Sequence, residues 1–347
     1  MLLLFVLYSV VLFTFIAIAI IYFKLIYPQK QLYNKFRAQG ISAEPFVPLV
    51  GQLPEIRKKR NKDEQMIYQE ELVAKHGNVY VFGFGPLTRL VLVEPNLLAD
   101  LLSRNNATNY EKPSDFVSAF QPIIGSHNLL ISGGSEHERA RRMLNPAFHH
   151  TNLKSMISII TDRTSKSIES MLSKEENAKP VDLQILFNQL TLSIIASSAF
   201  AVISEALRLY PPAPFFVREC THEHTIGTEH PIRIPKDASI LVDAYTLHRR
   251  SDLWPRPLEF DYTRWMRDLK TNLKPKLAHS FAYLPFAAGP RSCIGQNFAL
   301  LEAKLMLAMF VEKCNFDMVP GQRIVPDVKI TMRPKYGLLA KISRRER

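Results

Sequence analysis

The first 23 residues constrain this chain most, because none of them carries a charge. Leu, Val, Ile and Phe dominate them, and the polar interruptions are Ser9, Thr14 and two tyrosines. As a helix, the segment would extend roughly 34 Å, enough to cross a hydrocarbon core of ~30 Å. The alternative is a cleaved signal peptide, which would need a basic start, a shorter apolar run and a small-residue cleavage site. The sequence therefore favours a transmembrane anchor over residues 1–25.

Basic residues follow this apolar segment at Lys24, Lys30, Lys35 and Arg37. Positive charge beside a membrane span is typical of its cytosolic end, so we expect the rest of the chain in the cytosol. The chain has only 3 cysteines, too few for a disulfide framework, which agrees with a reducing compartment.

Residues 26–55 read as a linker, whose stiff, non-helical part is set by Pro45, Pro48, Gly51 and Pro54. A basic run, 57–60 with Lys62, comes next. It is either a solvated helix face or a contact for anionic lipid head groups. Both interpretations stay open at this point.

The net charge of +12 is compatible with nucleic acid, an anionic membrane surface or an acidic protein. Zinc-finger spacings and interleaved aromatic and basic motifs are absent from the sequence, so no nucleic-acid partner is predicted. Hydrophobic types make up 47% of the chain, and the residues after the linker, 56–347, are numerous enough to bury a large core.

Hydrophobic periodicity predicts a mainly α-helical fold with a small β-sheet. Strands are expected at 79–84, 89–93, around 232–234 and around 240–242. The expected helices are 66–76, 95–103, 136–144, 152–172, 182–201, 204–209 and 296–314.

The segment 286–295, Phe-Ala-Ala-Gly-Pro-Arg-Ser-Cys-Ile-Gly, carries the strongest chemical signal. Gly289 and Gly295 permit tight turns, and Cys293 stands just before a predicted helix, whose unpaired N–H groups favour a thiolate. Arg291 can pair with an anionic group. The thiol suits a metal ligand or a nucleophile, and a buried structural cysteine is the plainer alternative.

This segment resembles the haem-binding signature of the cytochrome P-450 family, Phe-x-x-Gly-x-Arg-x-Cys-x-Gly, at every fixed position. The resemblance implies a haem b cofactor whose iron is bound by the Cys293 thiolate. It also implies that Phe286 packs against the thiolate side of the haem and that Arg291 faces a haem propionate.

Other segments resemble the family in the expected order. His137-x-x-x-Arg141 is similar to its Trp-x-x-x-Arg helix, so Arg141 would contact a propionate, with His137 in place of the usual Trp. Arg218 matches a further propionate-binding arginine. Glu205 and Arg208 match the Glu-x-x-Arg helix, and Arg264 lies in the segment that supplies a second arginine. The resemblance implies that these last three residues form a buried ion network behind the cysteine loop.

The resemblance also implies the biological setting. It places the chain in the endoplasmic reticulum membrane with its haem domain in the cytosol, and it implies an NADPH-dependent reductase as electron donor. The stretches 145–149 and 190–192 look most like the branch that oxidises fatty acids and related lipids, so a hydrophobic substrate is expected.

His222 and His224 could chelate a metal by their spacing, although a solvated loop is the commoner role of such a pair.

The chain between Arg141 and Cys293 is shorter than the family's usual length, which predicts a central deletion near 200–202 in an otherwise P-450-like fold. The family's distal helix, with its Ala/Gly-Gly-x-Asp/Glu-Thr-Thr pattern, has no counterpart in the sequence, and no catalytic side chain is assigned. Three hypotheses remain. The chain is a membrane-anchored monooxygenase, a non-catalytic haem binder, or an isomerase or peroxide-using enzyme.

Overall fold

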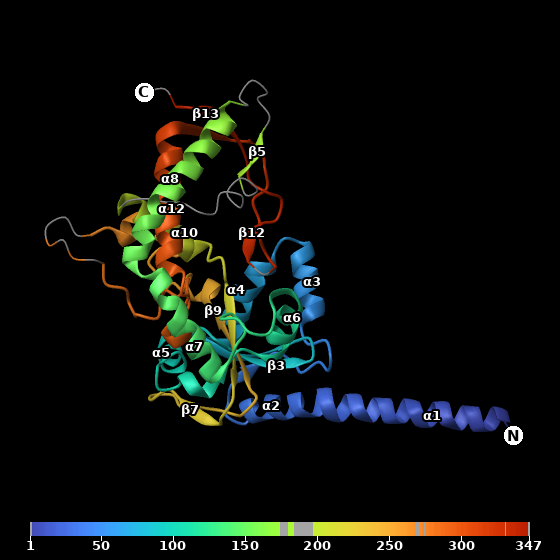
Figure 1. Cartoon of the computed structure of the whole chain (residues 1–347). Coiled ribbons are helices and arrows are strands. Elements are labelled where there is room, and N and C mark those ends of the chain that lie inside the picture. Colours follow the sequence, from blue (N-terminus) through green and yellow to red (C-terminus); the bar gives the residue numbers. More distant parts are fainter. Residues whose placement is uncertain are drawn as a thin grey trace. The chain divides into compact units, whose positions relative to one another are not determined.

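The computed structural model describes residues 2–173, 180–183, 197–267, 271, 273, 275–329 and 331–345. The chain folds as two compact units. Unit 1 comprises Met1–Leu101, Thr108–Asp115 and Val217–Asp243, and unit 2 comprises Leu102–Ala107, Phe116–Phe216 and Ala244–Arg347. Figure 1 shows the elements of both units along the chain.

Unit 1 begins with an apolar helix and then builds a sheet flanked by short helices. Its helical elements are α1 (Leu2–Ile21), the π-helical turn η1 (Tyr22–Ile26), α2 (Tyr27–Arg37), α3 (Leu53–Asn61), α4 (Gln65–His76) and α5 (Pro95–Leu101). Its strands are β1 (Ser42–Ala43), β2 (Val79–Phe84), β3 (Leu87–Leu92), β4 (Tyr110–Glu111), β6 (Phe215–Cys220), β7 (His224–Ile226), β8 (Ile232–Ile234) and β9 (Ser239–Asp243).

Six of these strands form one sheet in the order β1-β2-β3-β9-β6-β4. β2 and β3 make an antiparallel hairpin around Gly85 and Pro86, and Gly85 has the positive φ (60°) that such a tight turn requires. β3 pairs in parallel with β9, which lies about 150 residues further along the chain, with Leu90 opposite Ile240. Both of these side chains are completely buried, so the centre of unit 1's core lies at this pairing.

Unit 2 is mainly helical. It contains α6 (Ser114–Ile124), α7 (Gly134–Leu144), α8 (His150–Leu172), α10 (Ser197–Leu209), α11 (Ala244–Leu247) and α12 (Gln296–Lys313). Short 3-10 turns lie at Asn145–Phe148, Tyr262–Trp265 and Gly289–Arg291. Its strands are β5 (Val181–Asp182), β10 (Cys314–Met318), β11 (Pro326–Val328), β12 (Met332–Pro334) and β13 (Leu339–Arg344).

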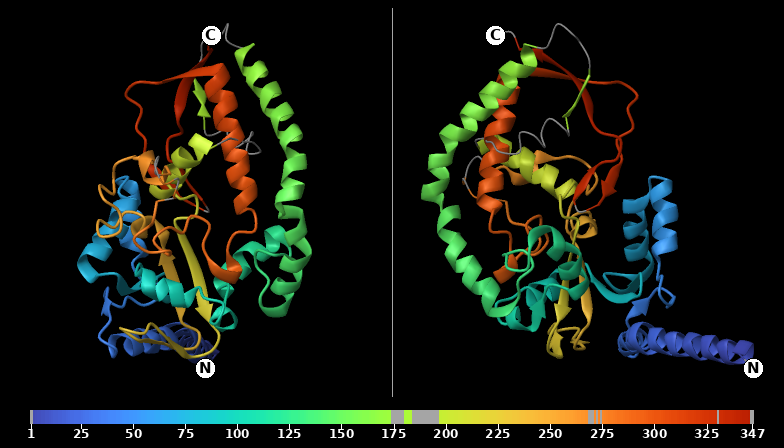
Figure 2. Two further views of the ribbon diagram at one scale, coloured as in Figure 1. Left: turned by 90° about the vertical axis from the view of Figure 1, so that its left-hand side faces the viewer. Right: turned by 45° about the vertical axis from the view of Figure 1, so that its right-hand side comes forward.

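The core of unit 2 forms where α8, α12 and the sheet β10-β13-β5 meet, as the ribbon views show (Figures 1 and 2). Ile168 of α8, Phe310 of α12 and Cys314 of β10 are at most 1% exposed there. α10 packs on α12 and ends at Leu209, because Pro211 and Pro212 cannot continue a helix.

Most predicted elements are confirmed within a few residues, including the hairpin 79–93 and the helix that follows Gly295. The helix predicted from Asp182 to Ala201 is wrong at its start, because Val181–Asp182 is a strand paired with β13. Residues 184–196 of that prediction lie outside the described residues. Within the predicted linker, α2 forms a regular helix, and the stretch from Glu44 to Gln52 has none.

Candidate functional site: the cysteine loop and its supports

The cysteine loop, residues 286–295, is held as a tight turn by its own backbone. The Cys293 N–H donates to the Phe286 carbonyl at 2.9 Å, and the Ser292 N–H donates to the Gly289 carbonyl at 3.0 Å. Gly295 is the N-cap of α12, so Cys293 stands two residues before that cap. The side chain of Cys293 is exposed, whereas Cys220 and Cys314 are buried. The loop therefore presents one accessible thiol just before a helix N-terminus.

Gly289 is required by the geometry of this loop. Its φ is +72°, and a Cβ at this position would lie 1.9 Å from the carbonyl oxygen of Leu102. Any side chain would clash with that backbone atom, so the loop can approach Leu102 only through a glycine. At Gly295 a Cβ would instead make ordinary contacts, 3.9 Å from both the Cys293 sulfur and the Phe148 ring.

Two arginines fasten the loop to its surroundings within unit 2. Arg141, from α7, donates to the Ser292 carbonyl at 2.5 Å and to the Ser292 hydroxyl at 3.3 Å. Arg291 donates to the Ser132 carbonyl at 2.8 Å. His137 lies one turn before Arg141 on the same helix and is 6% exposed. The structure thus brings Arg141 and Arg291 to the cysteine loop, bonded to backbone oxygens.

Arg218 lies in β6 of unit 1 and is 3% exposed, and its guanidinium donates to the Val217 carbonyl at 3.0 Å. Because the cysteine loop belongs to unit 2, the contact expected between Arg218 and a haem propionate stays a prediction.

The residues of this loop fit a haem group on its thiolate side. Haem offers an iron atom that binds thiolate sulfur and two carboxylates that need cationic hydrogen-bond donors. The loop supplies an accessible thiol and two guanidinium groups anchored beside it. The exposed thiol also argues against the plainer alternative of a buried structural cysteine.

A buried ion network lies in the same unit, and the structure brings together Glu205, Arg208 and Arg264 as the resemblance implied. Glu205 and Arg208 are fully buried and form a two-bonded pair at 2.8 and 2.9 Å. The Arg264 guanidinium reaches Glu205 at 3.2 Å. Arg208 also donates to three backbone carbonyls, those of His248, Pro257 and Glu259.

Burial alone would oppose the ionisation of Glu205. Hydrogen bonds from Arg208, from the Asp261 N–H and from the Trp265 indole outweigh this effect, and together with the charge of Arg208 they lower the pKa of Glu205. The network is therefore a charged, fully hydrogen-bonded pair, the kind of buried pair that fixes a unique local structure.

His248 connects this network to the chain that leads into the cysteine loop, and sequence reasoning missed it. Its Nε2 accepts from the Leu284 N–H at 2.8 Å, so the proton lies on Nδ1, which faces the Arg208 carbonyl at 3.2 Å. The ring is fully buried, and this burial lowers its pKa to about 3. No pattern around residue 248 signals the role, because both partners are backbone groups remote in sequence.

His222 and His224 do not form a metal centre with their neighbours. Among the residues that the structure describes, no group of three or more His, Cys, Asp or Glu side chains could hold a metal ion. The His224 ring lies 3.7 Å from the buried sulfur of Cys220, and burial raises the pKa of that thiol to about 11.

Comparison with known proteins identifies the class of protein that carries such a loop. The family model for cytochrome P450 matches residues 42–202 and 199–341. These two segments cover most of the chain, so it belongs to the cytochrome P450 family. Members of this family bind haem through a cysteine thiolate.

Individual relatives are 36–40% identical to this chain over 110–138 residues. The chain is 40% identical over 138 residues to a cytokinin hydroxylase of Arabidopsis thaliana, covering 40% of this chain and 25% of the relative. It is 36% identical over 132 residues to cytochrome P450 9e2 of Blattella germanica and 36% identical over 110 residues to cytochrome P450 4g1 of Drosophila melanogaster. These two alignments cover 38% and 32% of this chain and 24% and 19% of the relatives. The chain thus spans about a quarter of the length of the curated relatives that it matches.

Proposed function

We propose that this chain is a membrane-anchored haem-thiolate monooxygenase that inserts one oxygen atom from dioxygen into a hydrophobic substrate. The observation that carries the proposal is the exposed thiol of Cys293, presented by a hydrogen-bonded loop at the start of α12. Bound haem would supply the activation of dioxygen, which no amino-acid side chain provides.

Residues of the chain would act by binding and positioning. Cys293 would be the iron ligand, and Arg141 and Arg291 would hold the thiolate loop and pair with the propionates. Arg218 would provide a third cationic contact. Phe286 would cover the thiolate side, and Gly289 and Gly295 would let the backbone approach closely. The network of Glu205, Arg208 and Arg264 would support the loop through His248.

The electrons would come from an NADPH-dependent reductase. The sequence contains no nucleotide-binding signature of its own, and its net charge of +12 suits docking to an acidic protein surface. A fatty-acid-like substrate is favoured by the stretches 145–149 and 190–192. The substrates named for relatives range from cytokinins to carotenes, so the family alone does not choose among them.

The anchor would be α1, placing the protein in the endoplasmic reticulum membrane. Among the described residues, one helix, Phe5–Arg37, is long and apolar enough to span a membrane, and its most apolar 18-residue window has a mean hydropathy of 2.6 and no buried residue. Alkaline carbonate extraction of membranes from expressing cells tests this assignment. An anchored chain stays in the pellet, and a chain with a cleaved signal peptide appears shortened and soluble.

The test of the haem site is the reduced, carbon-monoxide-bound difference spectrum of the full chain in membranes. We expect a red-shifted thiolate Soret band that Cys293→Ser abolishes. Cys314→Ala is the matched control, because it removes a buried thiol of the same unit and should keep the band. Equal spectra from wild type and Cys293→Ser would contradict the proposed ligand.

A non-catalytic haem binder is the second candidate function. What favours it is the arrangement of the family match, whose two segments meet at residues 199–202, together with the missing distal pattern. A chain that shows the thiolate Soret band but consumes no NADPH above background with a reductase and lipid substrates would support this candidate over the monooxygenase.

A further inference from the structure

A hydrogen-bonded chain of three side chains lies in unit 1, whereas the cysteine loop belongs to unit 2. The Ser42 hydroxyl oxygen is 2.6 Å from His76 Nδ1, and His76 Nε2 is 2.6 Å from the Glu44 carboxylate. Side chains of these three types, bonded in this order, make up the activated serine of many hydrolases. The haem-thiolate function uses none of them.

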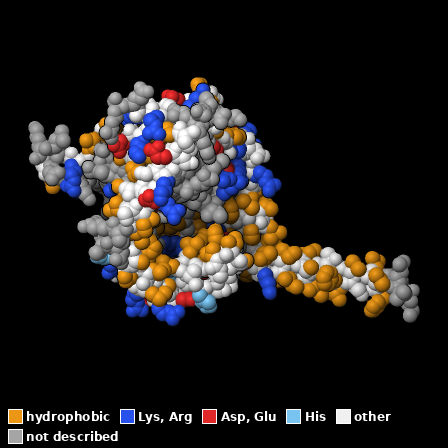
Figure 3. Space-filling view, turned by 45° about the horizontal axis from the view of Figure 1, so that its top comes forward, with side chains coloured by type: hydrophobic (Ala, Val, Ile, Leu, Met, Phe, Trp, Pro, Cys, Tyr) orange, Lys and Arg blue, Asp and Glu red, His pale blue; other side chains and the backbone are white. Residues whose placement is uncertain are grey.

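The local fold places Ser42 and Glu44 on one face of the sheet. They stand two residues apart in extended chain, in β1 and just after it, and side chains at that spacing share a face. β1 is an edge strand of the six-stranded sheet and pairs in parallel with β2. It follows α2, which continues α1, and Figure 3 shows hydrophobic side chains along α1. Ser42 is half-buried, so its hydroxyl is not sealed from solvent.

His76 is held against the same face by the end of its own helix. It is the last residue of α4, and Gly77, with a φ of +85°, turns the chain toward β2. The imidazole stacks on the Tyr80 ring with centroids 5.6 Å apart, and Tyr80 lies opposite Ser42 in the strand register. The His76 side chain is 6% exposed. A base fixed in this way needs no rearrangement to meet the serine hydroxyl.

The protonation states follow from the charge of Glu44. Burial raises the pKa of this carboxyl, but hydrogen bonds from His76 and Lys75 and the charge of Lys75 outweigh burial, so the pKa is lowered. An ionised carboxylate only accepts, so His76 Nε2 carries the proton of that bond. In the neutral ring Nδ1 is then the acceptor, and the Ser42 O–H donates to it. The imidazole is therefore oriented to take the serine proton.

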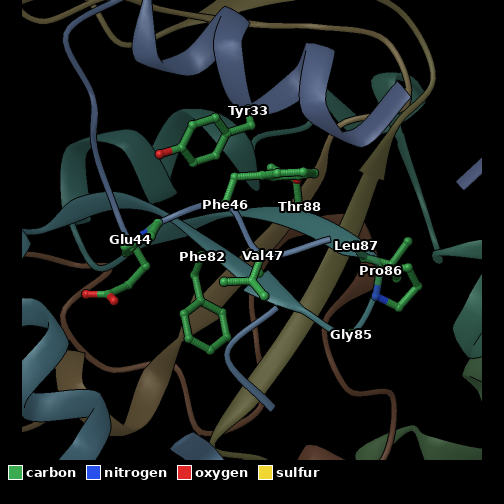
Figure 4. A pocket seen from close by; sticks show the side chains of 11 residues that line it. Tyr33, Glu44, Phe46, Val47, Phe82, Gly85, Pro86, Leu87 and Thr88 are labelled. Carbon is green, nitrogen blue, oxygen red and sulfur yellow. The ribbon is translucent and has the colours of Figure 1, made fainter. Parts of the chain in front are cut away.

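An apolar hollow adjoins this chain of side chains. Glu44 itself lines it, and the hollow has a volume of about 250 Å³ under α2, as Figure 4 shows. Two residues of extended chain advance about 6.6 Å, so the hollow begins within the length of a short ester joined to Ser42. An uncharged acyl or aryl group fits it better than an anion, which the Glu44 carboxylate would repel. Its other lining side chains are mainly apolar and include Tyr33, Phe46, Val47, Phe82 and Leu87.

The open edge of β1 supplies donors for a developing negative charge. The Glu44 N–H points inward and donates to the Val81 carbonyl at 3.0 Å, so the Ala43 N–H, one residue earlier, points to the open edge. This N–H directly follows the nucleophile, the position that binds the oxyanion in many serine hydrolases. On the same edge the Arg37 guanidinium donates to the Ile41 carbonyl at 2.8 Å, which adds a positive charge beside the serine.

We propose that Ser42, His76 and Glu44 form a second catalytic site, in unit 1, that hydrolyses small apolar carboxylic esters without the haem. The Ser42 oxygen attacks the ester carbonyl carbon as its proton passes to His76 Nδ1. The bond from the carbonyl carbon to the alcohol oxygen then breaks, and the alcohol leaves with that proton. Water attacks the acyl-serine, its proton returns through His76 to the Ser42 oxygen, and the carboxylic acid is released. Glu44 touches neither reactant and positions the imidazole.

The test uses the full chain purified in detergent, because most of α1 exposes apolar side chains. A fluorophosphonate probe, which reacts with activated serines, is added to the folded chain and to the chain in urea, and peptide mass spectrometry locates the label. We expect Ser42 to be labelled about 100-fold faster in the folded chain, the lower end of what a positioned base contributes. We also expect steady release of p-nitrophenol from p-nitrophenyl butyrate.

Variants of the three residues separate their roles. Ser42→Ala should abolish both signals. Ser42→Thr keeps a hydroxyl for His76 and should fold as the wild type does, yet its branched side chain should slow the attack. His76→Gln should slow labelling by about 10²–10⁴-fold, because the base is lost. Glu44→Gln should also slow it, and Glu44→Asp, which keeps the carboxylate, should recover part of that loss.

His127→Gln is the matched control. His127 pairs with Glu136 at 2.6 Å, a His–Glu contact of the same length, but this pair lies in unit 2 and the His127 side chain is 86% exposed. Its replacement should leave both signals unchanged. The thermal unfolding midpoint of each variant shows whether that variant is folded.

Three results would overturn the proposal. In the first, Ser42 is unlabelled in the folded chain or is labelled no faster than in urea. In the second, Ser42 is labelled but the ester is not turned over, so the serine is not regenerated. In the third, turnover survives in folded Ser42→Ala or is undiminished in Ser42→Thr, so another group hydrolyses the ester. Neither readout involves haem, so a missing thiolate Soret band would overturn the haem site and leave this site standing.

Discussion

At the scale of single residues, Glu205 carries a buried negative charge that Arg208, Arg264, the Trp265 indole and the Asp261 N–H all contact. Replacing it with Gln keeps the shape and removes the charge, which leaves the buried Arg208 uncompensated. Breaking a buried pair in this way costs about 3–5 kcal/mol of unfolding free energy. Urea unfolding followed by tryptophan fluorescence measures it, because Trp265 packs at the network and Trp254 lies 5.7 Å away.

Glu259→Gln is the control for this measurement. Glu259 forms an exposed pair with Arg256 at 3.0 Å, and pairs of this kind contribute at most about 1 kcal/mol. If Glu205→Gln destabilised the protein no more than Glu259→Gln does, the network would not support the fold.

His248 predicts a specific dependence of stability on pH. Its pKa in the folded chain is about 3, below the ordinary value of 6.5, so the folded state favours the neutral ring. The stability that this provides is complete above pH 6.5 and is lost as the pH falls from about 6.5 toward about 3. Between pH 7 and 5 Glu205 stays ionised, since its pKa is lowered, and therefore does not add to the slope.

We expect His248→Gln to be less stable at pH 7 than wild type, with a flatter decline between pH 7 and 5. Urea midpoints at several pH values measure both effects. His230→Gln, at an exposed position of unit 1, should keep the wild-type slope. An unchanged slope in His248→Gln would assign the acid sensitivity to other groups.

The residues of the cysteine loop were predictable because their signal is local: a run of ten positions specifies both the turns and the thiol. The ion network was partly visible, since Glu205 and Arg208 stand three residues apart on one helix face. The residues that contact the loop and the network could not be predicted from the sequence. Leu102 and His248 meet their partners across 187 and 36 residues, through backbone atoms whose positions the sequence does not encode locally.

At the scale of elements, α10 runs without a break through residues 200–202, the junction at which the sequence predicts a central deletion. Val202→Pro tests this helix directly, because proline removes one hydrogen bond and clashes with the preceding turn. The expected loss is about 3 kcal/mol, whereas Val202→Ala, which leaves the backbone intact, should lose much less. Thermal unfolding of both variants measures the two losses of stability. Equal losses would mean that the helix begins only after the junction.

Sequence patterns located the long helices and the hairpin well, because their hydrophobic periods are strong and local. The strands β10 to β13 were not predicted. They are three to six residues long and are stabilised by pairing across the chain, such as Leu339 with Asp182. The same pairing explains the wrong helix start at Asp182, where a strand partner 157 residues away outweighs local helix preference.

At the scale of the whole molecule, the sheet of unit 1 joins chain from both sides of the junction. β1 to β4 precede it, and β6 and β9 follow it. Loop-closure entropy changes only slowly with length, about 0.6 kcal/mol for each doubling, so a shorter central chain affects this pairing little. The predicted central deletion should therefore leave the sheet of unit 1 intact.

Ile240→Asp tests this long-range closure. Ile240 is completely buried opposite Leu90, so a carboxylate there would be desolvated without a partner and β9 would detach. We expect hydrogen exchange to accelerate in β3, at residues 87–92, about 150 residues before the substitution. Ile240→Val, which costs about 0.5–1.5 kcal/mol, should leave that exchange slow. Unchanged exchange in β3 with Ile240→Asp would show that the hairpin β2–β3 is stable alone, and that the segments before and after the junction fold without each other.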